Sequence, residues 1–190
     1  MRMRTLSQTK RLPQTAAPAA SAGLPSDLSV WLDKTSLVGL VLGAVQELPW
    51  SGLMERFKGA DNQQCRPQVL ATLLTYCYAI GLSDSQQIEE STGVEAVIRY
   101  LCAGDRPSAH LLIRFRRACR PLIEQALAQV LERAWDQRSR QLALLPEDRS
   151  SYLGPALGRV AGKPGRPDFV RLAERRIEGA VLLDSVDRDL

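Results

Sequence analysis

Arginines gather between residues 105 and 120, and their guanidinium groups suit bidentate contacts with phosphate. They are Arg106, Arg114, Arg116, Arg117 and Arg120. At about 100° per residue, the last four fall together on one side of a helix. The opposite side is an apolar arc that consists of Leu111, Leu112, Phe115, Ala118 and Cys119. The pattern predicts an amphipathic helix with one cationic face.

Such a face has two interpretations, and the spacing leaves both open. An ordinary amphipathic helix presents a solvated charged face without a partner. In a helix-turn-helix element, the second helix enters the major groove, and its arginines contact phosphates and bases. A Gly-containing turn at residues 103–107 and a capping Ser108 precede this helix, as that element requires.

The other reactive side chains do not form a predicted site. The four cysteines lie far apart in the sequence, and His110 is the only histidine. A zinc site needs about four closely spaced Cys or His ligands, so we expect no metal. We expect small buried cysteines in a reducing, cytoplasmic setting; they are Cys65, Cys77, Cys102 and Cys119. The sequence pairs no nucleophile with a base and has no phosphate loop, so it predicts no catalytic residue and no small-molecule substrate.

Composition limits the elements that can position these residues. The 190 residues are 45% hydrophobic, 24% charged and 5% aromatic, with a formal net charge of +4. These values are typical of one globular domain and exclude a collagen, a disulfide scaffold and a large multi-domain enzyme. No apolar run reaches the ~18 residues of a membrane span, so no membrane partner is expected.

The chain divides into three parts. Residues 1–25 are predicted to be a disordered basic tail, which is either simply solvated or an arm along a phosphate backbone. Residues 26–145 are predicted to form an all-α, multi-helix domain with a helix-turn-helix-like element. Residues 146–190 are predicted to be a linker and a weakly structured tail, because Gly, Pro and charged residues are frequent there.

Apolar spacing and capping residues place the helices of the domain. We expect helices from Asp33 to Leu48, Ser51 to Phe57, Pro67 to a stop at Gly81, a cap at Ser83 or Asp84 to about Glu90, Val94 to Cys102, and Ser108 to Gln141. Thr92 and Glu95 suggest a capping box for the fifth of these. Pro121 either kinks the last helix or begins a new one. A weak helix is expected at 169–178.

The order of several short motifs resembles the N-terminal domain of bacterial insertion-sequence transposases of the acidic-triad (DDE) class. The matching residues are Arg66-Pro67, Leu73 to Gly81, Ser83 to Glu89, Arg99 to Gly104, Arg106-Pro107 and Arg114 to Arg117. The similarity covers roughly residues 24–135. The sequence departs from the pattern at two places: Cys65 replaces a glycine, and Ser108-Ala109 replaces Asp-His.

The resemblance implies a DNA-binding protein that recognises insertion-sequence ends. The DNA contacts it suggests are Arg66, Arg106, Arg114, Arg116, Arg117 and Arg120. In such transposases an RNase H-like domain follows and holds two Mg²⁺ ions with three carboxylates. Because only 45 residues follow Leu145, we expect no such domain here, no cofactor and no phosphotransfer by this chain alone.

Three further interpretations complete the sequence predictions. The alternative function is an interaction module, a homodimer or a truncated regulator of a full-length transposase, with an interface on the apolar helices at 35–48 and 122–135. Asp184 follows an apolar run, like the first strand and first catalytic Asp of the RNase H-like domain, or by chance. The motif at 163–167 resembles a minor-groove hook, although Pro/Gly linkers also produce such triplets.

Overall fold

The computed structural model describes residues 24–50, 65–143 and 166–186, and all the regular structure in these ranges is helical. The elements are the 3₁₀ helix η1 (Leu28–Val30) and the α-helices α1 (Lys34–Gln46), α3 (Pro67–Ala79), α4 (Ser85–Val94), α5 (Ala96–Leu101), α6 (Ala109–Ala143) and α8 (Phe169–Val186). The all-α prediction is therefore confirmed for the described part of the chain.

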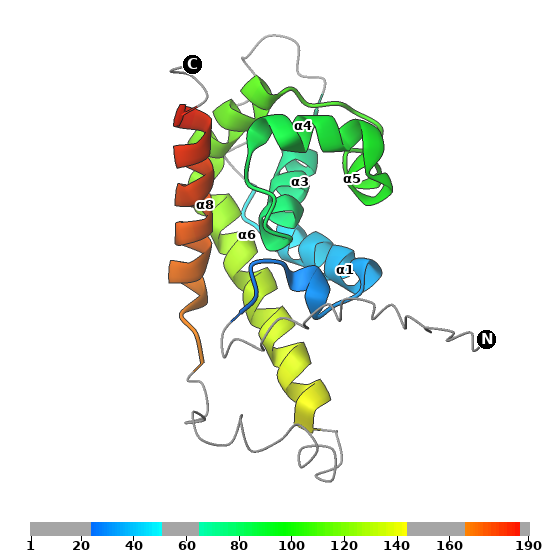
Figure 1. Cartoon of the computed structure of the whole chain (residues 1–190), viewed down its shortest axis with the longest axis vertical. Coiled ribbons are helices and arrows are strands. Elements are labelled where there is room, and N and C mark those ends of the chain that lie inside the picture. The colour runs from blue at the N-terminus through cyan, green and yellow to red at the C-terminus, as the bar shows by residue number, and fades with distance from the viewer. Residues whose placement is uncertain (1–23, 51–64, 144–165, 187–190) are drawn as a thin grey trace, which may run out of the picture.

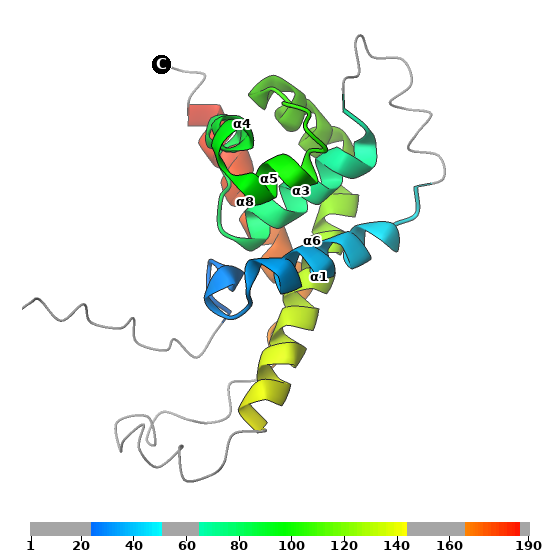
Figure 2. The ribbon, with the colours of Figure 1, turned by 90° about the vertical axis from the view of Figure 1, so that its right-hand side faces the viewer.

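The long helix α6 lies at the centre of the fold. Figure 1 shows α8 alongside one side of α6, whereas α1 and α3 lie on the other side. Figure 2 shows α1 and α3 crossing α6, with α4 and α5 above them. Helix α3 is the most deeply buried, since every residue from Leu70 to Ala79 is buried. This confirms that the segment is a buried helix, as its nearly uninterrupted apolar sequence predicts, although α6 and not α3 lies at the centre.

Local capping explains the ends of α1 and α3. The Asp33 carboxylate accepts a hydrogen bond from the Ser36 amide at 2.9 Å and so begins α1. Pro67 begins α3 at a position where its missing N–H costs nothing. At the other end, Gly81 adopts a φ of 81°, and its amide and that of Leu82 bond back into the last turn. This is a Schellman motif, which satisfies carbonyls that the helix leaves free.

The boundary between α4 and α5 differs from the sequence prediction. Asp84 caps α4 by accepting hydrogen bonds from the amides of Gln86 and Gln87. The helix then continues to Val94, beyond the expected end at Glu90. The predicted capping box is wrong, because the Thr92 hydroxyl donates to the Glu89 carbonyl within α4, and Glu95 makes no side-chain cap.

Pro121 kinks α6 without ending it. The backbone leaves helical geometry at Cys119, where φ is −116° and ψ is 17°. A proline inside a helix lacks the N–H of the ladder, and its ring clashes with the carbonyl four residues earlier, here that of Arg117. The chain resumes its helix and continues to Ala143. The kink thus separates a shorter N-terminal part of α6 from its longer C-terminal part.

The helix expected at 169–178 is confirmed, but it is regular and continues to Val186, so residues 169–186 are not a weakly structured tail. They form the regular helix α8, which packs along α6. The seam against the core repeats every three or four residues and consists of Phe169, Ala173, Ile177, Ala180 and Asp184. Asp184 therefore lies on a helix, and the strand suggested by the preceding apolar run does not form. An apolar helical stripe and a short strand are hard to distinguish in so short a run.

Several predictions fall on residues that the structure does not describe. These are the basic tail up to residue 23, the helix at 51–57, the loop at 58–64, the linker at 146–165 and most of the motif at 163–167. Within the described ranges, no helix is both long and apolar enough to cross a membrane.

Candidate nucleic-acid interface

The first turn of α6 is held by groups from two places in the fold. The Leu111 amide donates to Ser108 Oγ at 3.3 Å, which confirms Ser108 as a cap. The Ala109 amide donates to Glu89 Oε2 at 2.7 Å, and Glu89 belongs to α4. Both bonds satisfy amides that have no partner within the helix. Helix α4 therefore fixes the position from which α6 begins.

One stripe of the N-terminal part of α6 is exposed and polar. It consists of His110, Arg114 and Arg117, which are spaced four and three residues apart and so follow one another along the helix surface. None of these side chains makes a hydrogen bond or an ion pair with the described residues. The two guanidinium groups are thus open to solvent and to an external anion.

Two other predicted DNA contacts are also exposed. Arg66 precedes the first turn of α3, and Arg106 lies in the turn before α6. Neither has an ion-pair partner in the part of the chain that the structure describes.

Arg120 is in a different position, because acidic side chains already engage it. Its Nε donates to Glu124 Oε1 at 2.6 Å on α6, and its Nη2 lies 3.3 Å from Glu178 Oε1 on α8. The side chain is 39% exposed. These partners raise the pKa of the guanidinium, chiefly through the hydrogen bond with Glu124.

The prediction that Arg116 faces DNA is wrong. Only 1% of this residue is exposed, and its guanidinium is an ion-pair partner of Asp184. On the helical projection Arg116 lies only ~40° beyond Leu112, at the margin of the apolar arc. The buried face of α6 is rotated toward that margin, so that Leu112 is fully buried while Ala118 at the other margin is exposed.

The Arg116 guanidinium joins four helices. Its Nη1 donates to the Tyr78 hydroxyl of α3 at 2.8 Å, and its Nη2 pairs with Asp184 Oδ2 of α8. Ser85, the first residue of α4, donates from its amide to Asp184 Oδ1 at 3.3 Å and from its hydroxyl to Oδ2 at 3.1 Å. The carboxylate thus lies at the positive end of the α4 dipole as well as beside a guanidinium.

Burial dominates the chemistry of this network. Desolvation raises the pKa of Tyr78 to about 12, although the neighbouring Arg116 opposes the shift. The Tyr78 hydroxyl therefore stays protonated at neutral pH. The Arg116 Nε is buried and has no hydrogen-bond partner, so the network is not completely satisfied.

Two residues of this region are not identified from the sequence, His110 on the exposed stripe and Asp184 in the buried network. His110 reads as an isolated histidine, but its place in the 110–114–117 spacing is the signal that assigns it to the exposed stripe. Asp184 follows an apolar run that suggests a strand, yet it continues the three-and-four spacing of the α8 seam. That spacing is the signal by which its burial could be found.

The cysteines are buried and free, as predicted. Burial raises the pKa of Cys102 and Cys119 to about 11, and it raises that of Cys77 as well. For Cys65, a nearby Asp105 carboxylate adds to the effect of desolvation on the pKa. Thiols with such pKa values are poor nucleophiles at neutral pH. Among the residues that the structure describes, no group of three His, Cys, Asp or Glu side chains could hold a metal ion.

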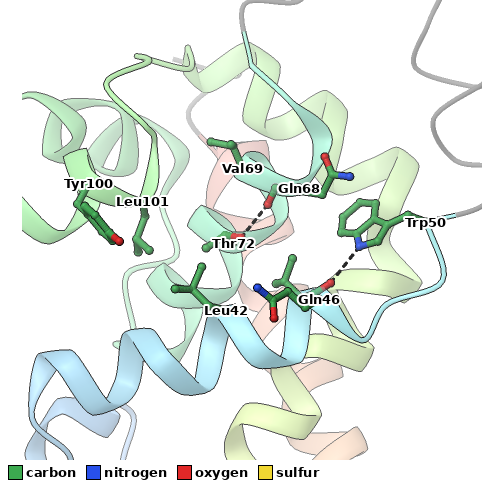
Figure 3. A pocket seen from close by; sticks show the side chains of 9 residues that line it. Leu42, Gln46, Trp50, Gln68, Val69, Thr72, Tyr100 and Leu101 are labelled. Atoms are coloured by element: carbon green, nitrogen blue, oxygen red, sulfur yellow. Dashed lines mark hydrogen bonds between the residues drawn. The ribbon is translucent and has the colours of Figure 1, made fainter.

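A groove of about 460 Å³ opens between α1, α3 and α5. Figure 3 shows Tyr100 and Leu101 on one side of it and Trp50 on the other, with Thr72 between them. The Trp50 indole donates to the Val45 carbonyl at 3.0 Å, which fixes the ring at the edge of the groove. The lining side chains are uncharged, so they offer no ion pair to a phosphate.

The described residues carry no formal net charge, so any positive charge on them is confined to local patches. The described residues hold as many acidic as basic side chains, so the net +4 comes from the other residues. Four basic residues without any acid lie in the N-terminal stretch; they are Arg2, Arg4, Lys10 and Arg11. Any attraction of the folded part for an anion must therefore come from a patch such as the Arg114–Arg117 stripe.

No protein-family model matches this chain, and it has no significant match among curated proteins or solved structures.

Proposed function

We propose that the chain is a DNA-binding protein related to transposases, and that the N-terminal part of α6 is its recognition helix. The observation that carries the proposal is the exposed stripe with Arg114 and Arg117, whose guanidinium groups have no acidic partner among the described residues. A duplex phosphate is the counter-ion that such an open arginine pair suits best. Insertion-sequence ends are the expected target because of the resemblance in sequence.

The elements around the stripe support a helix-turn-helix-like placement. Helix α4 packs against α6 and holds its first turn through Glu89. Arg106 precedes this turn and is exposed, as a phosphate contact at the entry to a recognition helix would be. His110 lies near the N-terminal end of α6, which is the end that reaches base edges in such elements.

The proposal assigns different roles to the six arginines expected from the sequence. Arg66, Arg106, Arg114 and Arg117 are candidates for DNA contact. Arg116 is buried in the core and pairs with Asp184, whereas Arg120 forms ion pairs with Glu124 and Glu178. The alternative interface on the apolar faces at 35–48 and 122–135 has less support, because most of those side chains pack inside this same chain.

Salt-dependent binding of the double variant Arg114→Ala/Arg117→Ala tests the proposal. We expect the variant to bind a labelled mixed-sequence duplex about tenfold or more weakly at low salt. The slope of log K against log salt should fall by roughly 0.9 for each phosphate that the variant no longer neutralises. Fluorescence anisotropy over a salt series measures both quantities.

The matched control is Arg171→Ala/Arg175→Ala on α8. These arginines are also exposed, lie on one helix and have no ion-pair partner among the described residues, so the change in net charge is the same. We expect this control to bind nearly as the wild type does. An equal decrease of affinity in both double variants, or a wild-type affinity that does not change with salt, would contradict the proposal.

A further inference from the structure

We propose that α8 is an autoinhibitory element, whose acidic side chains occupy two arginines of α6 and withhold them from DNA. The inference rests on the proposed function. It concerns Arg116 and Arg120, the two members of the arginine cluster that are not free. Each is engaged by an acid from α8, Arg116 by Asp184 and Arg120 by Glu178.

Both ion pairs lie in the C-terminal half of α8. Figure 1 shows α8 running beside α6 toward the end of the molecule where α4 lies. Along α8, Glu178 comes six residues before Asp184. Along α6, the partner of Glu178, Arg120, comes four residues after the partner of Asp184, Arg116, so the order of the partners is reversed. Two acids therefore meet two arginines across one helix pair. These carboxylates hold the places where phosphate oxygens could bind the same guanidinium groups.

The docked state of α8 has an energetic cost. A charged residue occupies the last position of the α8 seam, and the Arg116 Nε that faces this network is buried without a partner. A buried polar network that is only partly satisfied is less favourable than apolar packing. These features favour an interface that can open.

Release of α8 would also change the N-terminal segment. Arg176 of α8 donates to the Pro25 carbonyl at 2.5 Å and to the Tyr78 carbonyl at 2.8 Å. Undocking would therefore free the described start of the chain at Pro25 together with the two arginines of α6. Opening thus adds the positive charge of Arg116 and Arg120 to the proposed interface.

Neutralising one acid of α8 in the full chain tests this regulation. Glu178 is 58% exposed, so Glu178→Gln should leave the fold intact. We expect this variant to bind the mixed-sequence duplex about two- to fivefold more tightly, with a steeper salt dependence, because one acid no longer competes for Arg120. Glu174→Gln is the matched control, since it makes the same charge change one turn away at a residue without an ion pair among the described residues.

Hydrogen exchange supplies the second measurement. On adding the duplex, amides of α8 should exchange faster, whereas those of the buried α3 should not. Equal affinity of Glu178→Gln and Glu174→Gln, together with unchanged exchange in α8, would overturn the regulation. If Arg114→Ala/Arg117→Ala still weakens binding in that case, the DNA-binding function stands. Absence of duplex binding by every variant at low salt would overturn both.

Discussion

The Arg116–Asp184 ion pair ties four helices together through side chains that are almost completely buried. A buried charge is costly to desolvate, and its counter-charge offsets that cost only while both partners are present. The hydrogen bonds from Ser85 and to Tyr78 occupy much of the remaining capacity of the two groups. Removing one partner therefore differs in kind from removing both.

The variant Asp184→Asn isolates this difference. The amide keeps the size of the carboxylate but leaves the Arg116 guanidinium buried without a counter-charge. We expect it to lower the free energy of unfolding by about 3–5 kcal/mol, measured by urea denaturation. The double variant Arg116→Met/Asp184→Leu replaces the pair by apolar groups and should stay within about 1–2 kcal/mol of the wild type. A double variant as unstable as Asp184→Asn would contradict this explanation.

For single residues, the sequence predicts the arginine-rich face of α6, but not that Arg114 and Arg117 are exposed while Arg116 is buried. Periodicity places Arg114, Arg116 and Arg117 on one side of α6, because a projection considers the helix in isolation. The position of the neighbouring helices decides which margin of the apolar arc is buried, and Asp184 lies far away in sequence. The local sequence around Arg116 therefore gives no indication of this distant ion-pair partner.

The helix ends show how local chemistry fixes single elements. Helices α3 and α5 both end in a Schellman motif, with Gly81 in one and Ala103 in the other at positive φ. Glycine adopts this conformation freely, whereas for an alanine it costs about 1–2 kcal/mol. In addition, a Cβ at position 81 would lie 3.0 Å from the Ser26 carbonyl oxygen.

The two motifs predict opposite effects of reciprocal substitutions. Gly81→Ala should destabilise the protein by about 1–2 kcal/mol or more, since it adds both strain and a close approach to Ser26. Ala103→Gly should stabilise it by up to about 1 kcal/mol, because it relieves the strain at φ 53°. Thermal and urea denaturation of both variants would check the pair. Two shifts of the same sign would show that the left-handed conformation does not control these turns.

Elements are predicted best where a capping residue and an apolar period coincide. Asp33, Pro67, Gly81 and Ser108 mark helix ends in the structure, as the sequence indicates. The sequence underestimates helix α8, because charged residues interrupt its apolar spacing and the segment before it is rich in Gly and Pro. The stability of α8 depends on packing along α6, which helix propensity does not record.

At the scale of the whole molecule, Arg176 joins the beginning of the described chain to its last helix. Its guanidinium donates to carbonyls of Pro25, Tyr78 and Ala79, and so it covers the C-terminal end of α3. A cation at this end is favoured by the helix dipole and satisfies carbonyls that α3 leaves free. Desolvation lowers the pKa of this guanidinium, yet three carbonyl oxygens accommodate it.

Replacing this guanidinium tests whether α8 is part of one cooperative unit. Arg176→Met keeps an apolar stem but removes the donors, so the carbonyls of Tyr78 and Ala79 are left without this partner. We expect a decrease of about 1–3 kcal/mol in unfolding free energy. Hydrogen exchange should become faster in α8 and near residues 24–32, while the C-terminal part of α6 keeps its protection.

Arg175→Met, an exposed neighbour without an ion pair among the described residues, is the control and should change neither measurement. Faster exchange confined to α8, with residues 24–32 unchanged, would show that Arg176 does not couple the two ends.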